Sequence, residues 1–172
     1  MFDRKEIDRM GGWSLPVPVF LWILEHVPSG SHILELGAGK GTEVLSREYQ
    51  VTSIENDPRF ASSPSVILAD ITPTPAATSR GQGGWYERET LEANLPKDYD
   101  LFIVDAPMRK IGRSGILDHL DLFRSDRTTI IDDVNRPAEK EICEVFAKLL
   151  GVEPTILSCD RFPYRQTAIL ET

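Results

Sequence analysis

The sequence predicts an α/β protein in which a mostly parallel sheet is covered by helices on both faces. Short aliphatic runs alternate with amphipathic stretches through most of the 172 residues, as they do in chains built from βαβ units. The runs are almost continuously apolar, which is typical of strands that are buried on both faces. The length suits one domain with its own hydrophobic core.

The first predicted element is a helix that begins near Pro16, is capped by Ser14 and ends before Pro28. The polar stretch 1–12 before it is expected to be a mobile arm. Strands are predicted at 32–36, 51–55, 65–69, 99–104, 128–131, 155–158 and 165–170. Helices are predicted at 41–48, 87–94, 116–123 and 136–150, with loops at 72–84 and 106–115.

These elements form one expected domain, 1–172, with an N-terminal arm and helix (1–29) and a core (30–172). The formal net charge of −8 disfavours a broad nucleic-acid surface, because such surfaces are rich in Lys and Arg. Cys143 and Cys159 have no metal-ligand or redox spacing and are expected to be reduced thiols. The N-terminus lacks the apolar stretch of a signal peptide, and no apolar run could span a bilayer. We expect a cytoplasmic protein with no membrane contact.

A glycine-rich turn follows the first predicted strand and contains Gly37, Gly39 and Gly41. Such a turn lets a nucleotide approach the backbone closely. The dinucleotide fingerprint has its third glycine five residues after the first, but Thr42 stands there in this chain. Glu35, two residues before the turn, suits a ligand that carries a positive charge. The spacing therefore disfavours a nicotinamide oxidoreductase.

The segment 35–42, with the sequence E-L-G-A-G-K-G-T, resembles motif I of class I S-adenosylmethionine-dependent methyltransferases. The resemblance covers about residues 30–170 and implies a Rossmann-like, doubly wound sheet of seven strands. The implied strand order is 3-2-1-4-5-7-6, with the last strand antiparallel. S-adenosylmethionine is the implied cofactor. The resemblance places its methionine part against Gly37, Ala38 and Gly39, with Glu35 near its amino group.

Further cofactor contacts are expected at the ends of the next two strands. Glu55 ends the second strand 20 residues after Glu35, where a carboxylate accepts hydrogen bonds from ribose hydroxyls. Asn56, the next residue, belongs to the same expected site. The resemblance implies that Asp70 binds the adenine amino group and that Ile71 packs on the adenine ring.

Three carboxylates follow the fourth and fifth strands, at positions where the carboxyl ends of adjacent strands meet. They are Asp105, Asp132 and Asp133. Three like charges in one place are unfavourable unless a cation neutralises them, and oxygen ligands favour Mg²⁺ or Ca²⁺. The pattern is similar to that of catechol-type O-methyltransferases, which implies a metal at these acids and a lysine base near Lys110. In the alternative, no metal binds, Asp105 touches the cofactor or acceptor, and Asp132 or Asp133 caps the next helix.

The loop after the fourth strand is basic, and it is also similar to a looser group of small bacterial methyltransferases. In this interpretation Arg109, Arg113 and Arg136 bind the phosphate or carboxylate of an anionic acceptor, because a guanidinium fork suits either group. The alternative is a solvated basic loop that forms salt bridges with the nearby acids.

The sequence therefore predicts an enzyme that methylates a hydroxyl of a small, anionic molecule, with Asp105 and Lys110 as catalytic candidates and Mg²⁺ as a candidate cofactor. The expected partner is a small-molecule acceptor, not a nucleic acid, and a homodimer is left open. Two alternatives remain: a methyltransferase that acts on RNA or protein, and a non-catalytic module that binds S-adenosylmethionine.

Overall fold

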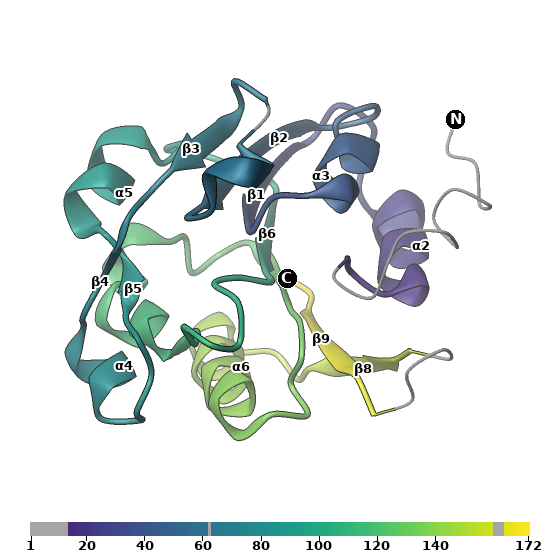
Figure 1. Ribbon diagram of the computed structural model, residues 1–172. Coiled ribbons are helices and arrows are strands. Elements are labelled where there is room, and N and C mark those ends of the chain that lie inside the picture. The colour runs from purple at the N-terminus through teal and green to yellow at the C-terminus, as the bar shows by residue number, and fades with distance from the viewer. Residues whose placement is uncertain (1–13, 62, 160–163) are drawn as a thin grey trace.

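The computed structural model describes residues 14–61, 63–159 and 164–172 (Figure 1). The arm predicted at 1–12 lies outside these residues. Seven strands form the main sheet: β1 (His32–Leu36), β2 (Gln50–Glu55), β3 (Val66–Leu68), β6 (Leu101–Val104), β7 (Thr128–Ile131), β8 (Thr155–Ser158) and β9 (Gln166–Leu170). Their order is β3-β2-β1-β6-β7-β9-β8, and β9 is antiparallel to both of its neighbours.

Counted along the chain within this sheet, the order is 3-2-1-4-5-7-6. The predicted Rossmann-like α/β fold, including its antiparallel last strand, is therefore confirmed. It is the arrangement that the resemblance to class I methyltransferases implies.

The two faces of the sheet bury separate hydrophobic clusters. Leu34 and Leu36 belong to the cluster that includes residues of α5 (Arg88–Asn94) and α6 (Pro137–Leu150). Ile33 belongs to the cluster that includes residues of α2 (Val17–His26) and α3 (Lys40–Leu45). Because successive side chains of a strand point to opposite faces, β1 is buried on both sides. Figure 1 shows α2 and α3 on one side of the sheet and α5 and α6 on the other.

The register of the parallel strands brings their carboxyl ends to one edge. Leu36 lies opposite Ile54 and Val104, and Val104 lies opposite Ile131. The residues that follow β1, β6 and β7 therefore emerge side by side. We call this edge the carboxyl edge, and it is where an open α/β sheet binds its ligands.

Helix α6 begins and ends as the sequence predicts. Pro137 occupies its first turn, where a missing N–H removes no helical hydrogen bond, and Gly151 ends it at a φ of +70°. The Phe146 ring of α6 lies 6.1 Å from the Phe102 ring of β6, which in turn stacks on Phe123 at 4.8 Å. These aromatic contacts hold the segment after β6 against the sheet.

Two local predictions, the N-cap of the first helix and the helix at 116–123, differ from the structure. The N-cap residue of α2 is Pro16, which has no side-chain oxygen, while Ser14 contributes its backbone carbonyl to another contact. The helix predicted at 116–123 is replaced by two 3-10 turns, η2 (Ser114–Asp118) and η3 (Leu120–Leu122). They meet at His119, whose φ of −132° and ψ of 19° interrupt a helix.

The predicted loop at 72–84 contains structure that the sequence analysis missed. A short antiparallel ribbon pairs β4 (Ile71–Thr72) with β5 (Trp85–Tyr86), and the short helix α4 (Pro75–Thr78) lies between them. A 3-10 turn, η1 (Pro58–Phe60), follows β2. Among the described residues, none of the helices has the length and apolar character that crossing a bilayer requires.

Candidate functional site

The glycine loop at the end of β1 packs closely against the segment that follows β6. Gly37 has a φ of +105°, in the region that favours glycine, and a Cβ added there would lie 2.9 Å from the Cβ of Ala106. The Asp105 backbone N–H also donates to the Leu36 carbonyl at 3.1 Å. The loop and Asp105 therefore line the same point of the carboxyl edge.

Glu35 precedes this loop and is connected to it through the hydroxyl of Thr42. Its Oε2 accepts hydrogen bonds from Thr42 Oγ1 at 2.7 Å and from Ser53 Oγ at 2.8 Å. Thr42 Oγ1 also accepts from the Gly39 N–H at 2.9 Å. Burial raises the pKa of Glu35 to about 7, and these two hydroxyl donors oppose that rise. A positively charged ligand at the loop would favour the ionised form.

Glu55, the last residue of β2, holds the other side of the loop. Its Oε2 accepts from the Ala38 N–H at 3.1 Å, and its Oε1 accepts from the N–H groups of Asn56 and Asp57 at 2.7 and 2.8 Å. A carboxylate has about four lone-pair positions, so three are used and one remains for a ligand. The side chain is nearly buried, which fixes its orientation.

Asp70 and Ile71 follow β3 at the same edge. Asp70 is exposed, and its carboxylate forms no hydrogen bond or ion pair within the described part of the chain. Ile71 is partly buried and lies opposite Tyr86 in the β4–β5 ribbon. Tyr86 is fully buried and donates to the Ile54 carbonyl at 3.2 Å. The ribbon thus fixes the backbone beside Asp70 while leaving its carboxylate available.

The three acids after β6 and β7 come together. Asp105, Asp132 and Asp133 each offer one oxygen within 4.8 Å of the others. Asp133 has a φ of 63°, a left-handed conformation that Asp tolerates better than most residues. The cluster has the composition of a hard-metal site.

Two guanidinium groups lie among these acids. Arg113, 3% exposed, places its Nη2 3.1 Å from Asp105 Oδ1 and 3.2 Å from Asp133 Oδ2. Arg165 donates from Nε to Asp132 Oδ2 at 3.0 Å, and its Nη2 also contacts that oxygen. The two cations therefore reach all three carboxylates.

Backbone contacts hold both guanidiniums in place. Arg113 donates from Nη1 to the Asp132 carbonyl at 2.9 Å and from Nε to the Pro107 carbonyl at 3.3 Å. Arg165 donates from Nη1 to the Ser14 carbonyl at 2.9 Å, which ties the segment before α2 to the carboxyl edge. We call the three acids with Arg113 and Arg165 the acid–arginine network.

Two acids of the network, Asp132 and Asp105, differ in how easily they ionise. Burial opposes ionisation of Asp132, but Arg165, with further help from Arg113 and Thr167, holds its pKa below the usual range. Burial, together with the charge of Asp132, raises the pKa of Asp105 well above the usual range. Thr167 Oγ1 donates to Asp132 Oδ1 at 2.5 Å. Asp132 is thus the fixed anion, and Asp105 is the carboxyl that resists ionisation.

A metal ion does not fit this cluster as it stands. A divalent cation among the three oxygens would lie beside two guanidiniums that already pair with them, and it would displace hydrogen bonds from both. The Mg²⁺ expected from the sequence is therefore not supported. Arg113 is buried in this network, away from the surface position that its predicted role in acceptor binding requires.

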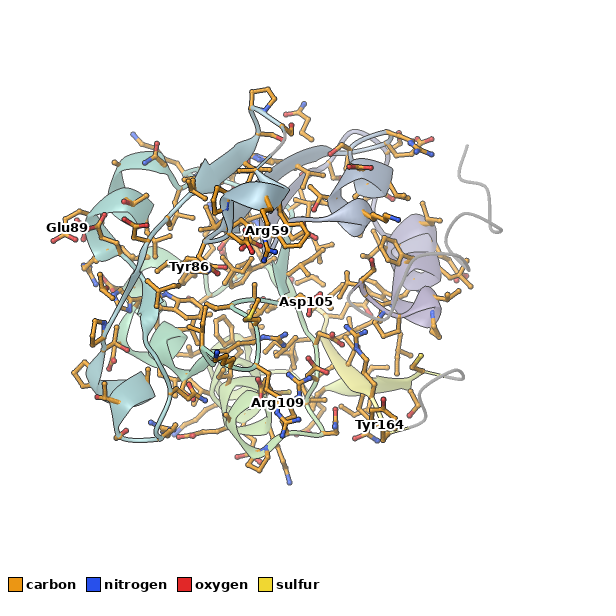
Figure 2. All side chains as sticks on the ribbon, viewed as in Figure 1. Arg59, Tyr86, Glu89, Asp105, Arg109 and Tyr164 are labelled. Atoms are coloured by element: carbon orange, nitrogen blue, oxygen red, sulfur yellow. The ribbon has the colours of Figure 1, made fainter. Side chains whose placement is uncertain are left out.

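The remaining predicted residues lie on the surface of the same edge. Arg109 and Lys110 are exposed in the turn after β6, where Ile111 N–H donates to the Met108 carbonyl at 2.8 Å. Lys110 has no ion pair with the acids among the described residues. Arg136 Nη1 lies 2.8 Å from Asp133 Oδ2. Figure 2 shows Asp105 near the centre of the molecule and Arg109 closer to α6.

Four side chains of the site were missed in the sequence analysis: Thr42, Ser53, Arg165 and Thr167. Thr42 stands three residues after Gly39, a spacing that could have indicated its hydrogen bond to the loop. Ser53 lies two residues before Glu55 on a buried strand. Arg165 and Thr167 lie 33 and 35 residues after Asp132, so local spacing gave no sign of them.

Neither a family model nor a curated protein matches the chain. Several solved structures are similar to it, among them the following two. A chain from the E. cuniculi Mtq2–Trm112 complex, responsible for methylation of the eRF1 translation termination factor, is 15% identical with a TM-score of 0.48, over 90% of this chain and 92% of that one. A methyltransferase from Pyrococcus furiosus is 14% identical with a TM-score of 0.49, over 95% of this chain and 88% of that one.

The comparison with Mtq2–Trm112 corrects one prediction. The sequence analysis expected a small-molecule acceptor, whereas that structure is a complex responsible for methylating a protein factor. The expectation of a small-molecule partner is therefore contradicted.

Proposed function

We propose that this chain is an S-adenosylmethionine-dependent methyltransferase whose cofactor lies along the carboxyl edge from Asp70 to Asp105. The observation that carries the proposal is the glycine loop between two acids. Glu35 and Glu55 hold it from either side, and Gly37 packs against Ala106. A site of this kind offers carboxylates to an ammonium group and to a ribose, with a close backbone approach between them.

Each residue of the edge has a proposed role. Glu35 lies nearest the amino group of the cofactor, the free lone pair of Glu55 accepts from the ribose, and Asp70 accepts from the adenine amino group beside Ile71. When bound, S-adenosylmethionine supplies a methyl group on a positively charged sulfur. Asn56 and Ala38 present backbone at the rim of this site, since both donate to Glu55.

Asp105 is the proposed catalytic residue, because it is the carboxyl at the point where the loop meets the end of β6. Burial and the charge of Asp132 raise its pKa above the usual range, which makes its ionised form a stronger proton acceptor for the methyl acceptor. Arg113 is reassigned from acceptor binding to holding Asp105 in position, since its Nη2 lies 3.1 Å from Asp105 Oδ1. The proposal does not extend to Lys110, which is exposed and unpaired with the acids among the described residues.

Calorimetry tests cofactor binding. We expect the chain to bind S-adenosylmethionine and not NAD, and we expect Asp70→Asn to weaken that binding about tenfold, as loss of a hydrogen bond to a charged group does. Asp70 suits the test because its exposed carboxylate has no partner among the described residues. Glu153→Gln, an exposed change before β8 at the opposite edge, is the matched control. Absence of heat with S-adenosylmethionine would overturn the proposal.

Transfer itself needs a labelled cofactor. The chain is incubated with labelled S-adenosylmethionine and separated protein and RNA fractions of a cell extract, and the label is followed. The Mtq2–Trm112 complex acts on a protein, so protein fractions come first. We expect label in one fraction and its loss in Asp105→Asn. Cofactor binding with no transfer to any fraction would favour a non-catalytic binding module.

A further inference from the structure

A hollow of about 410 Å³ opens at the carboxyl edge beside the acid–arginine network. Its walls come from the turn after β6, the start of α6 and the turn after α4. Three arginines line it: Arg80, Arg109 and Arg136. Two glutamates, Glu139 and Glu141, also line it. The chain has a net charge of −8, so the gathering of three guanidiniums in one hollow is unusual for its surface.

The carboxylates of the hollow are already paired. Arg80 Nε donates to Glu141 Oε2 at 2.9 Å. Arg136 Nη1 lies 2.8 Å from Asp133 Oδ2 and 3.8 Å from the buried Glu139 Oε1. Arg109, by contrast, is exposed, and its guanidinium forms no hydrogen bond or ion pair with residues 14–61, 63–159 and 164–172. Arg136 is ion-paired, but its buried Nη1 donates no hydrogen bond within the described residues, so both Arg109 and Arg136 have donors left for a ligand.

The first turn of α6 adds backbone donors to the same wall. The helix has 14 residues and begins at Pro137 without a side-chain cap. The hollow is lined by Pro137 and Ala138, so it faces the end of the helix that carries partial positive charge. A planar guanidinium fork with uncapped helical N–H groups is a combination that favours phosphate and carboxylate oxygens.

Ion pairs connect the hollow to the catalytic candidate. Arg136 contacts Asp133, whose Oδ2 lies 3.2 Å from Arg113 Nη2, and that same nitrogen lies 3.1 Å from Asp105 Oδ1. An anion in the hollow would therefore lie along the same edge as the group that is proposed to act on the acceptor.

We propose that this hollow is an oxyanion site that binds a phosphate or carboxylate group of the methyl acceptor, with Arg109 as its principal ligand. The inference rests on the proposed function, because the oxyanion belongs to the acceptor. Arg80, which donates to Glu141, shapes the site, and Arg136, which is ion-paired with Asp133, adds positive potential and a buried N–H without a hydrogen-bond partner among the described residues.

The test uses inorganic phosphate and acetate as probes of the full chain. Thermal unfolding is followed as each salt replaces potassium chloride at constant ionic strength, since a ligand that binds the folded state raises Tm by mass action. The variant is Arg109→Gln, an exposed change. The control is Lys97→Gln, an exposed loss of one charge before β6, at the opposite edge of the sheet.

We expect phosphate, acetate or both to raise Tm, and the stronger probe identifies the chemistry of the acceptor group. Arg109→Gln should weaken that binding about tenfold, while Lys97→Gln should not change it. No rise with either salt, or the same rise in Arg109→Gln as in the unaltered chain, would overturn the inference. Calorimetry with S-adenosylmethionine keeps the two proposals apart, because Arg109→Gln should bind the cofactor normally whether or not the oxyanion site exists.

Discussion

Replacing Arg113 by Met tests how the acid cluster is neutralised. Arg113 donates five hydrogen bonds, two to the carboxylates of Asp105 and Asp133 and three to the carbonyls of Asp105, Pro107 and Asp132. Its side chain is 3% exposed, so water cannot replace these contacts. Removing one partner of a buried ion pair costs about 3–5 kcal/mol, because the remaining charge is left uncompensated.

We therefore expect Arg113→Met to lower the free energy of unfolding by about 3–5 kcal/mol, measured by urea denaturation at pH 7. For a chain of this length, that corresponds to a fall in Tm of about 6–20 °C. Arg124→Met is the matched control. Arg124 is 33% exposed and pairs with exposed Asp98 and Asp126, so its loss should cost about 0–1 kcal/mol.

A double variant separates charge from packing. In Arg113→Met with Asp133→Asn, one carboxylate that Arg113 pairs with is gone, so the loss should be smaller than in Arg113→Met alone. A loss below about 1 kcal/mol for Arg113→Met, or no recovery in the double variant, would refute the interpretation of the network as a set of compensated buried charges.

Three further predictions follow from the same edge. Gly37→Ala should lower the free energy of unfolding, measured in urea, by about 1–3 kcal/mol, because the new Cβ would lie 2.9 Å from the Cβ of Ala106 at a φ of +105°. Gly39→Ala is the control and should leave the free energy of unfolding unchanged, because a Cβ at Gly39 would have no atom within 4 Å. The pKa of Glu35 rises on folding from 4.5 to about 7, so the folded state binds more protons than the unfolded state between these pH values. The free energy of unfolding should therefore fall as the pH rises through this range, by about 3 kcal/mol at most from this group. A Glu35→Gln variant whose stability has the same pH profile as that of the unaltered chain would contradict this. Mg²⁺ and Ca²⁺ should leave Tm unchanged, and a rise that a chelator reverses would restore the metal hypothesis.

The sequence predicted the parts of the fold that repeat a strong pattern. The strands at 32–36, 128–131 and 155–158 have the bounds that the apolar runs predict, and Gly151 ends α6 as predicted. The β4–β5 ribbon was missed because a strand of two residues is too short to have a period. The helix predicted at 116–123 was wrong because its apolar spacing also fits two 3-10 turns that meet at His119.

The candidate site was predictable where it follows strand ends. Glu35, Glu55 and Asp105 belong to runs whose place in the sheet the pattern defines, and the structure brings Glu35 and Glu55 to one loop. The positive charges were not predictable in the same way. Arg165 reaches Asp132 from the position just before β9, which joins the sheet by antiparallel pairing, and nothing in local spacing indicates that a cation from there enters an acid cluster.

The position of Arg165 in the chain has a consequence for how the protein is made. Asp105, Asp132 and Asp133 leave the ribosome before Arg165, because synthesis proceeds from the N-terminus. Strand β9 lies between β7 and β8, although it follows both in sequence. A nascent chain that ends before residue 165 therefore carries three acids with one of their two network arginines missing. Synthesis of β9 therefore both adds a strand between β7 and β8 and brings the second arginine, Arg165, to Asp132.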